Sequence, residues 1–168
     1  VMAASIFIGC KKGENDPGLT LSSRKARISG VWKLTSANFS EVEVINSKTT
    51  TTVYSYDGVN MTKTEGGDGI TYPYSETLTI GKDGTFKYEV SRSRTHFGTQ
   101  YDYLDIYEGV WYFIRGNKEL DVKNRERVEF LIQKSINSTT VGGTTVSSTE
   151  TFEGRSNSYN YLFLLDRL

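Results

Sequence analysis

The sequence predicts an all-β protein, an antiparallel meander of about eight to ten strands that closes into a barrel, with one short N-terminal helix. Beyond residue 10 the chain is rich in Thr, Ser, Tyr, Phe, Val and Ile, which favour strands, and its glycines stand beside Asp and Asn, which favour turns. Apolar and polar residues alternate repeatedly, whereas no window of ten or more residues repeats apolar positions with helical spacing. An open sandwich of the same strands is the alternative.

The helix is expected within residues 19–29, where a serine N-cap precedes the helix-forming run RKAR, and it ends at Gly30. A first strand is expected over residues 30–39, with Trp32 on its inward face because apolar and polar side chains alternate there. The later strands are expected at residues 49–56, 59–63, 76–80, 85–91, 101–115, 119–123, 128–136, 144–152 and 159–165.

Short turns join these strands into hairpins. Asp57-Gly58 is a preferred two-residue hairpin turn, and residues 81–84 (GKDG) and Gly142-Gly143 mark two further turns. Gly109 marks a bend within the long segment 101–115. Residues 64–75 and 137–145 are expected to form the longer loops.

Composition excludes several classes of function. The 168 residues carry 20 Lys and Arg against 20 Asp and Glu, so one globular domain without net charge is expected, and no basic field would attract nucleic acid. A single cysteine excludes an intramolecular disulfide framework and every multi-cysteine zinc pattern. We therefore expect no nucleic-acid partner and no cofactor.

Catalytic machinery is not evident in the sequence, so we predict that the protein is not an enzyme. No serine stands in a G-x-S-x-G elbow, and a nucleophilic triad would have to use His96, the one histidine of the chain. His96 could be combined with Asp102 and Asp105 as a metal site, but no ligand-spacing rule supports that combination. An exposed histidine at a hairpin tip is the simpler interpretation, and no metal is expected.

The N-terminus indicates a lipid anchor. Residues 1–9 (VMAASIFIG) are small or apolar, as at the end of a secretory signal peptide, and with Cys10 they resemble a bacterial lipobox. In such lipoproteins the cysteine receives acyl chains that hold the protein in the membrane. We therefore expect a residual signal peptide at 1–9, a lipidated Cys10 with a flexible polar tether at 10–18, and the folded domain at 19–168. A buried free cysteine or a short first strand is the alternative.

A family resemblance adds to these observations. The segment Arg24 to Leu34 follows the pattern R-K-A-R-x-x-G-x-W-K-L, and Gly109-Val110-Trp111 repeats the G-x-W motif on a later strand. Together with Cys10 and the Lys-rich tether, these motifs resemble the lipocalin-like lipoproteins of Bacteroidetes. The resemblance implies a lipocalin-like barrel anchored at the cell envelope, at the outer membrane, with Gly30, Trp32 and Trp111 as its barrel-closing motif.

Aromatic residues are the candidate contact and core positions. Trp32 and Trp111 are expected to be buried plugs of the barrel, because a large rigid ring fills the space at its end. Tyr101, Tyr103 and Tyr107 lie closer together in the sequence than packing requires, and they could stack on a sugar or a lipid head group. Ordinary packing between strands is the alternative for these tyrosines.

Two functions remain open. In the first, the barrel is filled and the protein is an interaction or structural module of the envelope that contacts another envelope protein or a glycan. In the second, the barrel binds or carries a small apolar or amphipathic ligand. The side chains expected inward are bulky, which favours the first function; a cavity of several hundred Å³ would favour the second. These side chains are Trp32, Leu34, Phe86, Tyr88, Val90, Phe130 and Ile132.

Overall fold

The computed structural model describes residues 24–114, 126–153 and 160–165, which form one short helix and a sheet of ten antiparallel strands. The prediction of an all-β antiparallel meander is therefore confirmed. The elements are α1 (Arg24–Ile28), β1 (Gly30–Lys33), β2 (Ala37–Ile45), β3 (Lys48–Tyr56), β4 (Asn60–Glu65), β5 (Asp68–Ile80), β6 (Thr85–His96), β7 (Thr99–Ile114), β8 (Glu126–Val141), β9 (Thr144–Thr151) and β10 (Asn160–Leu165).

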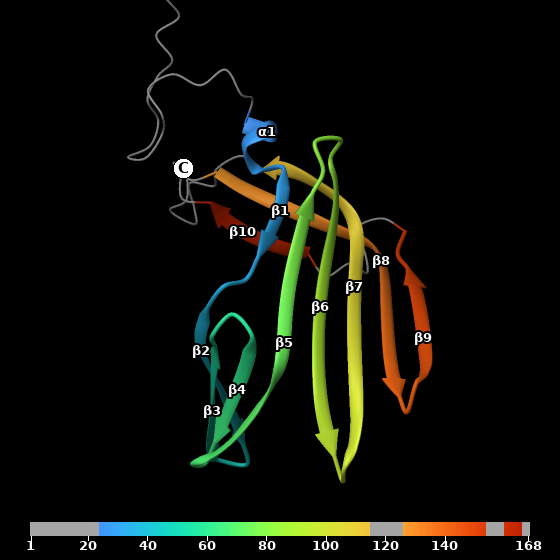
Figure 1. The fold of residues 1–168 in the computed structure, drawn as a ribbon. Helices are drawn as coiled ribbons and strands as arrows, with labels where there is room; N and C mark the ends of the chain where they lie inside the picture. Colours follow the sequence, from blue (N-terminus) through green and yellow to red (C-terminus); the bar gives the residue numbers. More distant parts are fainter. Residues whose placement is uncertain (1–23, 115–125, 154–159, 166–168) are drawn as a thin grey trace, which may run out of the picture.

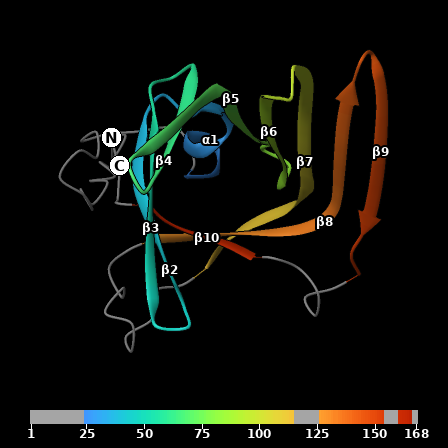
Figure 2. The same cartoon turned by 90° about the horizontal axis from the view of Figure 1, so that it is seen from below.

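From β2 to β9, each strand pairs with the next one in sequence, as a meander requires. β1 returns to pair with the second half of β5, and β10 pairs with the first half of β8, whose second half pairs with β9. Figures 1 and 2 show the sheet curling, with β2 to β4 on one side, β8 and β9 on the other, and β5 to β7 between them. Within the described strands no hydrogen-bonded pairing joins the two ends of the sheet, so hydrogen bonds do not close a barrel there.

β5 is shared by two parts of the sheet, and Pro73 stands where its partner changes. Its residues 68–73 pair with β4, whereas residues 74–80 pair with β6. The amide of Tyr74 donates to the carbonyl of Val59 on the β4 side, 3.0 Å away, so the nitrogen of Pro73 faces β6. Because proline has no N–H to donate, the ladder between β5 and β6 ends there, and the two strands diverge into a fork (Figure 1).

Among the described residues, two buried clusters hold the sheet together. The larger one lies where β5 ends and β6 begins, and it contains Ile80, Phe86, Trp111, Val128, Phe130 and Ile132. The smaller one, Tyr56, Met61 and Tyr72, lies between β3, β4 and the first half of β5. Phe86 and Phe130 meet edge to face, with ring centroids 5.0 Å apart. The inward placement predicted for Phe86, Val90, Phe130 and Ile132 is confirmed by their burial.

The two tryptophans have different surroundings. Trp111 is 3% exposed, and its indole N–H donates to the carbonyl of Gly81, 2.9 Å away, which ties β7 to the turn between β5 and β6. Trp32 is 47% exposed, and its indole N–H donates to the carbonyl of Ile28 in α1. The expectation that Trp32 is buried is therefore wrong: β1 has only β5 as a described neighbour, and its four residues are all exposed.

The bend predicted at Gly109 is confirmed as a shift in the register between β7 and β8, located between Glu108 and Gly109. A Cβ atom at position 109 would stand 2.0 Å from the carbonyl oxygen of Leu131. Only a glycine lets the two backbones approach so closely at this bulge.

Most predicted hairpins are confirmed, including the turn at Asp57-Gly58, where the Asp57 carboxylate accepts the amides of Val59 and Asn60. Two predictions of loops are wrong. Residues 64–75 form a tight hairpin between β4 and β5, and residues 137–145 are mostly strand on either side of the turn at Gly142-Gly143. The expected first strand is also two strands, β1 and β2.

The helix observed within the predicted range 19–29 is Arg24–Ile28. The predicted strand at 119–123 lies outside the described residues, as do residues 1–18 with the expected signal peptide, Cys10 and the tether.

Candidate functional site

Among the described side chains, eight tyrosines lie on one face of the sheet, which we call the tyrosine face. Strand register places them there: Tyr56 and Tyr72 flank Met61 of β4, Tyr88 is opposite Tyr107, and the even residues of β6 continue the same face. Both buried clusters belong to this face. Its tyrosines are Tyr54, Tyr56, Tyr72, Tyr74, Tyr88, Tyr101, Tyr103 and Tyr107.

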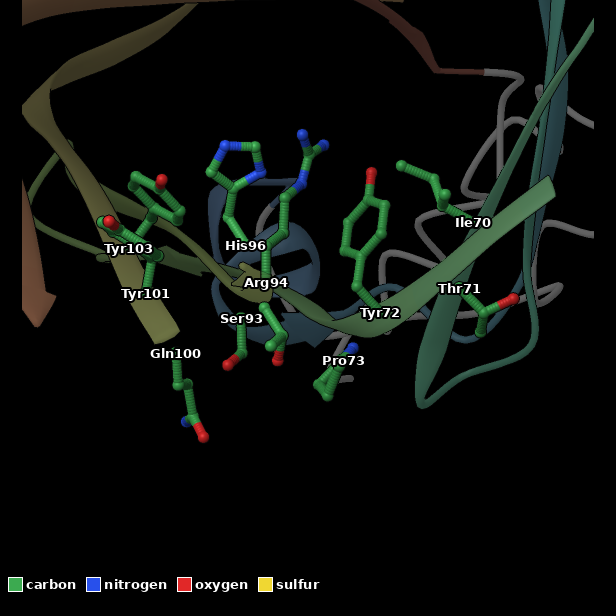
Figure 3. A pocket seen from close by; sticks show the side chains of 11 residues that line it. Ile70, Thr71, Tyr72, Pro73, Ser93, Arg94, His96, Gln100, Tyr101 and Tyr103 are labelled. Atoms are coloured by element: carbon green, nitrogen blue, oxygen red, sulfur yellow. The ribbon is translucent and has the colours of Figure 1, made fainter. Parts of the chain in front are cut away.

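A cleft of about 890 Å³ opens at the fork between β5 and β6. Because the strands have separated there, side chains from both faces of the sheet line it. Figure 3 shows Tyr72, Arg94 and His96 pointing to one side of the strands, and Ser93, Pro73 and Gln100 to the other. The full lining is Ile70, Thr71, Tyr72, Pro73, Ser93, Arg94, Thr95, His96, Gln100, Tyr101 and Tyr103.

Arg94 and Tyr72 form one wall of the cleft. The guanidinium carbon of Arg94 lies 4.4 Å from the centroid of the Tyr72 ring, a cation–π contact between β6 and β5 across the fork. Tyr72 is 7% exposed and belongs to the smaller cluster, so it is a rigid support. Arg94 itself is exposed, and among the described residues it has no ion pair.

Tyr101 and Tyr103 form the opposite wall, on β7. Their ring planes are 14° apart and their centroids 6.4 Å apart, so the two rings are nearly parallel along the strand. Arg92 lies 5.2 Å from the centroid of the Tyr103 ring and forms an ion pair with Asp105 at 3.4 Å. The charge of Arg92 is therefore neutralised beside the cleft, whereas that of Arg94 is available.

A second polar group lies on the other face of the same hairpin. The Asp102 carboxylate accepts hydrogen bonds from the hydroxyl of Ser93 (2.5 Å) and the amide of Gln100 (2.9 Å). These two bonds, the one from Ser93 contributing most, hold the pKa of Asp102 below its ordinary value. Asp102 stays ionised and holds both cleft-lining side chains in place.

A partly buried network of hydrogen bonds adjoins the cleft on β5 and β6. The hydroxyls of Tyr74 and Tyr88 both donate to the carboxylate of Glu76, the one from Tyr88 over 2.6 Å, and Tyr56 donates to the carbonyl of Tyr74. Burial and then the bond to Glu76 raise the pKa of Tyr74. The ring of Tyr74 meets that of Tyr72 edge to face, so the network also fixes the wall that carries Arg94.

Of the three tyrosines proposed as contacts from the sequence, two line the cleft. Tyr101 and Tyr103 do so, whereas Tyr107 stacks on Tyr88, with ring centroids 6.1 Å apart, beside the larger cluster. The barrel-closing motif lies away from the cleft: Trp32 is on β1, and Trp111 is in the larger cluster.

His96 is exposed at the end of β6, next to the turn of the β6–β7 hairpin, as expected. It also lines the cleft. Among the described residues no group of three or more His, Cys, Asp or Glu side chains could hold a metal ion.

The wall formed by Tyr72 and Arg94 was not predicted from the sequence. The predicted strand ends at Ser91, although the alternation that begins at Phe86 continues through Arg92 and Arg94. Following that alternation would have placed Arg94 on the same face as Tyr88. The sequence predicts a loop at Tyr72, and only the register of β5 against β6, in which Tyr74 is opposite Arg92, brings it beside Arg94.

In comparisons with known proteins, no family model, no curated protein and no solved structure matches this chain. Among the described residues, no helix has the length and apolar character that crossing a membrane requires.

Proposed function

We propose that the protein is a non-catalytic binding protein of the cell envelope, which holds a small amphipathic ligand in the cleft between β5 and β6. The observation that carries this proposal is the cleft of about 890 Å³ with Tyr72, Tyr101 and Tyr103 in its walls. Sites for small ligands occupy about 300–1,000 Å³ and combine aromatic walls with a few polar groups. The bulky inward residues fill the two clusters and leave this fork open.

The side chains of the cleft fit an amphipathic ligand better than an apolar one. Tyrosine offers a flat apolar ring together with a hydroxyl, and Arg94 and Gln100 offer hydrogen-bond donors. A purely apolar molecule would cover these donors without satisfying them, which costs free energy.

We also propose that a lipid anchor at Cys10 holds the protein at the outer membrane, and that the sheet is a lipocalin-like barrel. The lipobox-like residues 1–9, the polar tether and the two G-x-W motifs support this assignment. The antiparallel meander curls as the sheet of such a barrel does (Figures 1 and 2).

Native mass spectrometry of the full chain, purified gently from the membranes of its own host, tests the binding function. We expect a co-purifying small molecule that is released on unfolding, and we expect Tyr103→Ala to reduce its occupancy. Thr145→Ala, on the distant β8–β9 hairpin, is the control that keeps the ligand bound. A clean unliganded mass, together with a melting temperature that no lipid or sugar library shifts, would contradict the proposal.

An interaction module for another envelope protein is the second candidate. It is favoured by exposed apolar side chains on and beside β2, an end strand of the sheet: Phe39, Val42, Val44, Ile45 and Val53. Crosslinking in intact cells from position 44, followed by identification of the captured protein, tests this candidate. Loss of one specific crosslinked partner in a Val42→Lys variant is the expected result, and the absence of any specific partner would contradict it.

A further inference from the structure

We infer that the ligand of this cleft is a carboxylate-bearing oligosaccharide, held by the guanidinium of Arg94 with its sugar rings stacked on Tyr101 and Tyr103. The inference rests on the proposed binding function and names the class of ligand. It follows from the balance of charge in the cleft, from the geometry of the arginine, and from the arrangement of the aromatic and polar side chains around it.

The charge balance favours a ligand with a single negative charge at the binding point. Arg94 is the one permanently charged side chain among the described lining residues. The neighbouring cations are already paired, Arg92 with Asp105 at 3.4 Å and Lys63 with Glu65 at 3.2 Å. Asp102 lies on the opposite face of the hairpin, so the tyrosine-face side of the cleft carries an uncompensated positive charge. A monoanionic carboxylate matches one arginine.

The geometry of Arg94 favours a planar anion. With the guanidinium carbon 4.4 Å from the Tyr72 centroid, the ring covers the guanidinium and leaves N–H groups available to a partner in the cleft. Two parallel N–H groups of a guanidinium match the two oxygens of a carboxylate. Because Tyr72 is buried and held by Tyr74, the guanidinium is held in place before a ligand arrives.

The opposite wall of the cleft favours a ligand with more than one sugar ring. Tyr101 and Tyr103 present two nearly parallel rings, with centroids 6.4 Å apart along β7. Two successive platforms can each stack on the apolar face of a sugar ring. On the same face, the hydroxyls of Tyr101 and Tyr103 can pair with sugar hydroxyls. A ligand with hydroxyl-rich rings and one carboxylate fits the two tyrosines and Arg94 together.

The test is an array of uronic-acid oligosaccharides, each printed beside its methyl ester and a neutral oligosaccharide of equal length, probed with the full-length protein in detergent. We expect at least one acidic oligosaccharide to bind ten times or more tightly than its methyl ester, because the ester removes the charge and keeps the rings. Arg94→Gln should abolish this preference without changing the affinity for the ester.

Matched variants separate charge from stacking. Lys87→Gln removes a cation from the same strand on the opposite face and should keep the preference. Arg94→Lys keeps the charge without the planar fork and should retain only part of it. Tyr101→Ala and Tyr103→Ala should weaken acid and ester alike. Unchanged melting temperatures show that each variant is folded.

Two results overturn the inference. One is equal binding of acids and esters, and the other is the absence of every uronic-acid oligosaccharide among the bound sugars. If the mass-spectrometric experiment releases a ligand of another class that Tyr103→Ala displaces, the proposed binding function stands and this inference alone fails. If neither experiment finds a ligand, both fail.

Discussion

Gly109 lies against the carbonyl oxygen of Leu131 so closely that a Cβ atom at position 109 would stand 2.0 Å from it. The contact would join a backbone oxygen to a Cβ atom, and no rotamer change moves a Cβ atom. The bulge itself would therefore have to shift. We expect Gly109→Ala to lower the free energy of unfolding by at least about 2 kcal/mol, measured by urea denaturation.

Gly69→Ala is the matched control for this prediction. A Cβ at position 69 would meet only the hydroxyl of Thr64, at an ordinary 3.6 Å. Its effect should stay within about 0.5 kcal/mol. Equal stability of the two variants would show that β7 and β8 do not approach each other as described.

Trp111 should contribute far more to stability than Trp32. Trp111→Ala empties a buried site and breaks the bond to Gly81, so we expect a loss of about 3–5 kcal/mol. Trp32→Ala removes a half-exposed ring and one hydrogen bond to Ile28, and should cost about 1 kcal/mol or less. Thermal and urea unfolding of the two variants measure the difference, and the reverse ranking would contradict the burial assigned to each ring.

Tyr74 should make the folded protein sensitive to alkali. Its pKa in the folded state is raised above the ordinary value of 10.0, by burial first and by the bond to Glu76 second. Above pH 10 the unfolded chain loses this proton while the folded chain keeps it, so stability is complete below that pH and falls as the pH rises through the folded pKa. Urea midpoints at about pH 8 and about pH 11 measure the fall.

The variant Tyr74→Phe isolates this contribution, because it keeps the ring and removes the ionisable hydroxyl. We expect its midpoint to fall less between the two pH values than that of the wild type. Identical falls would mean that Tyr74 does not cause the alkaline sensitivity.

Pro73 should keep the fork open. A residue with an N–H at this position stands opposite Ser93 and can donate the next hydrogen bond of the β5–β6 ladder. We expect Pro73→Thr to add a slowly exchanging amide at position 73, detected by hydrogen exchange in NMR spectra, and to weaken ligand binding in the cleft. Ser75→Thr, already within the ladder, is the control that should change neither. A rapidly exchanging amide at position 73 would show that another feature separates the strands.

Cys10 should determine where the protein resides. If this residue carries the lipid anchor, Cys10→Ser leaves the folded domain intact and moves the protein from the membrane fraction to the soluble fraction. Cell fractionation with immunoblotting measures this, and Ser5→Ala, within the signal-like segment, is the control. A Cys10→Ser variant that stays in the membrane fraction would contradict the anchor.

Local chemistry explains which elements the sequence could predict. The turn at Asp57-Gly58 depends on the Asp57 carboxylate accepting two neighbouring amides, and the turn at Gly142-Gly143 on positive φ angles that glycine adopts without strain. Both causes lie within a few residues of the turn. Tyr101 and Tyr103 were found for a similar reason, since alternation along one strand shows that they share a face.

The predictions that proved wrong also have a physical cause. Residues 64–75 contain three glycines and a proline, which predict a loop, yet pairing with β4 turns most of them into strand. Trp32 and Trp111 share the G-x-W pattern, but one is exposed and the other buried because β1 and β7 have different neighbours. A pattern shows which side chains share a face, not whether that face is covered.

By itself, then, the sequence determined the strand-rich composition, the alternation and most of the turns, because each depends on residues close together in the chain. Only the tertiary structure decided that Arg94 rests on Tyr72 and that Tyr101 and Tyr103 form the opposite wall. Those residues come from three strands, and their meeting depends on register and on the divergence of β5 and β6 at Pro73. Such relationships arise from hydrogen bonds between distant segments, which no local pattern encodes.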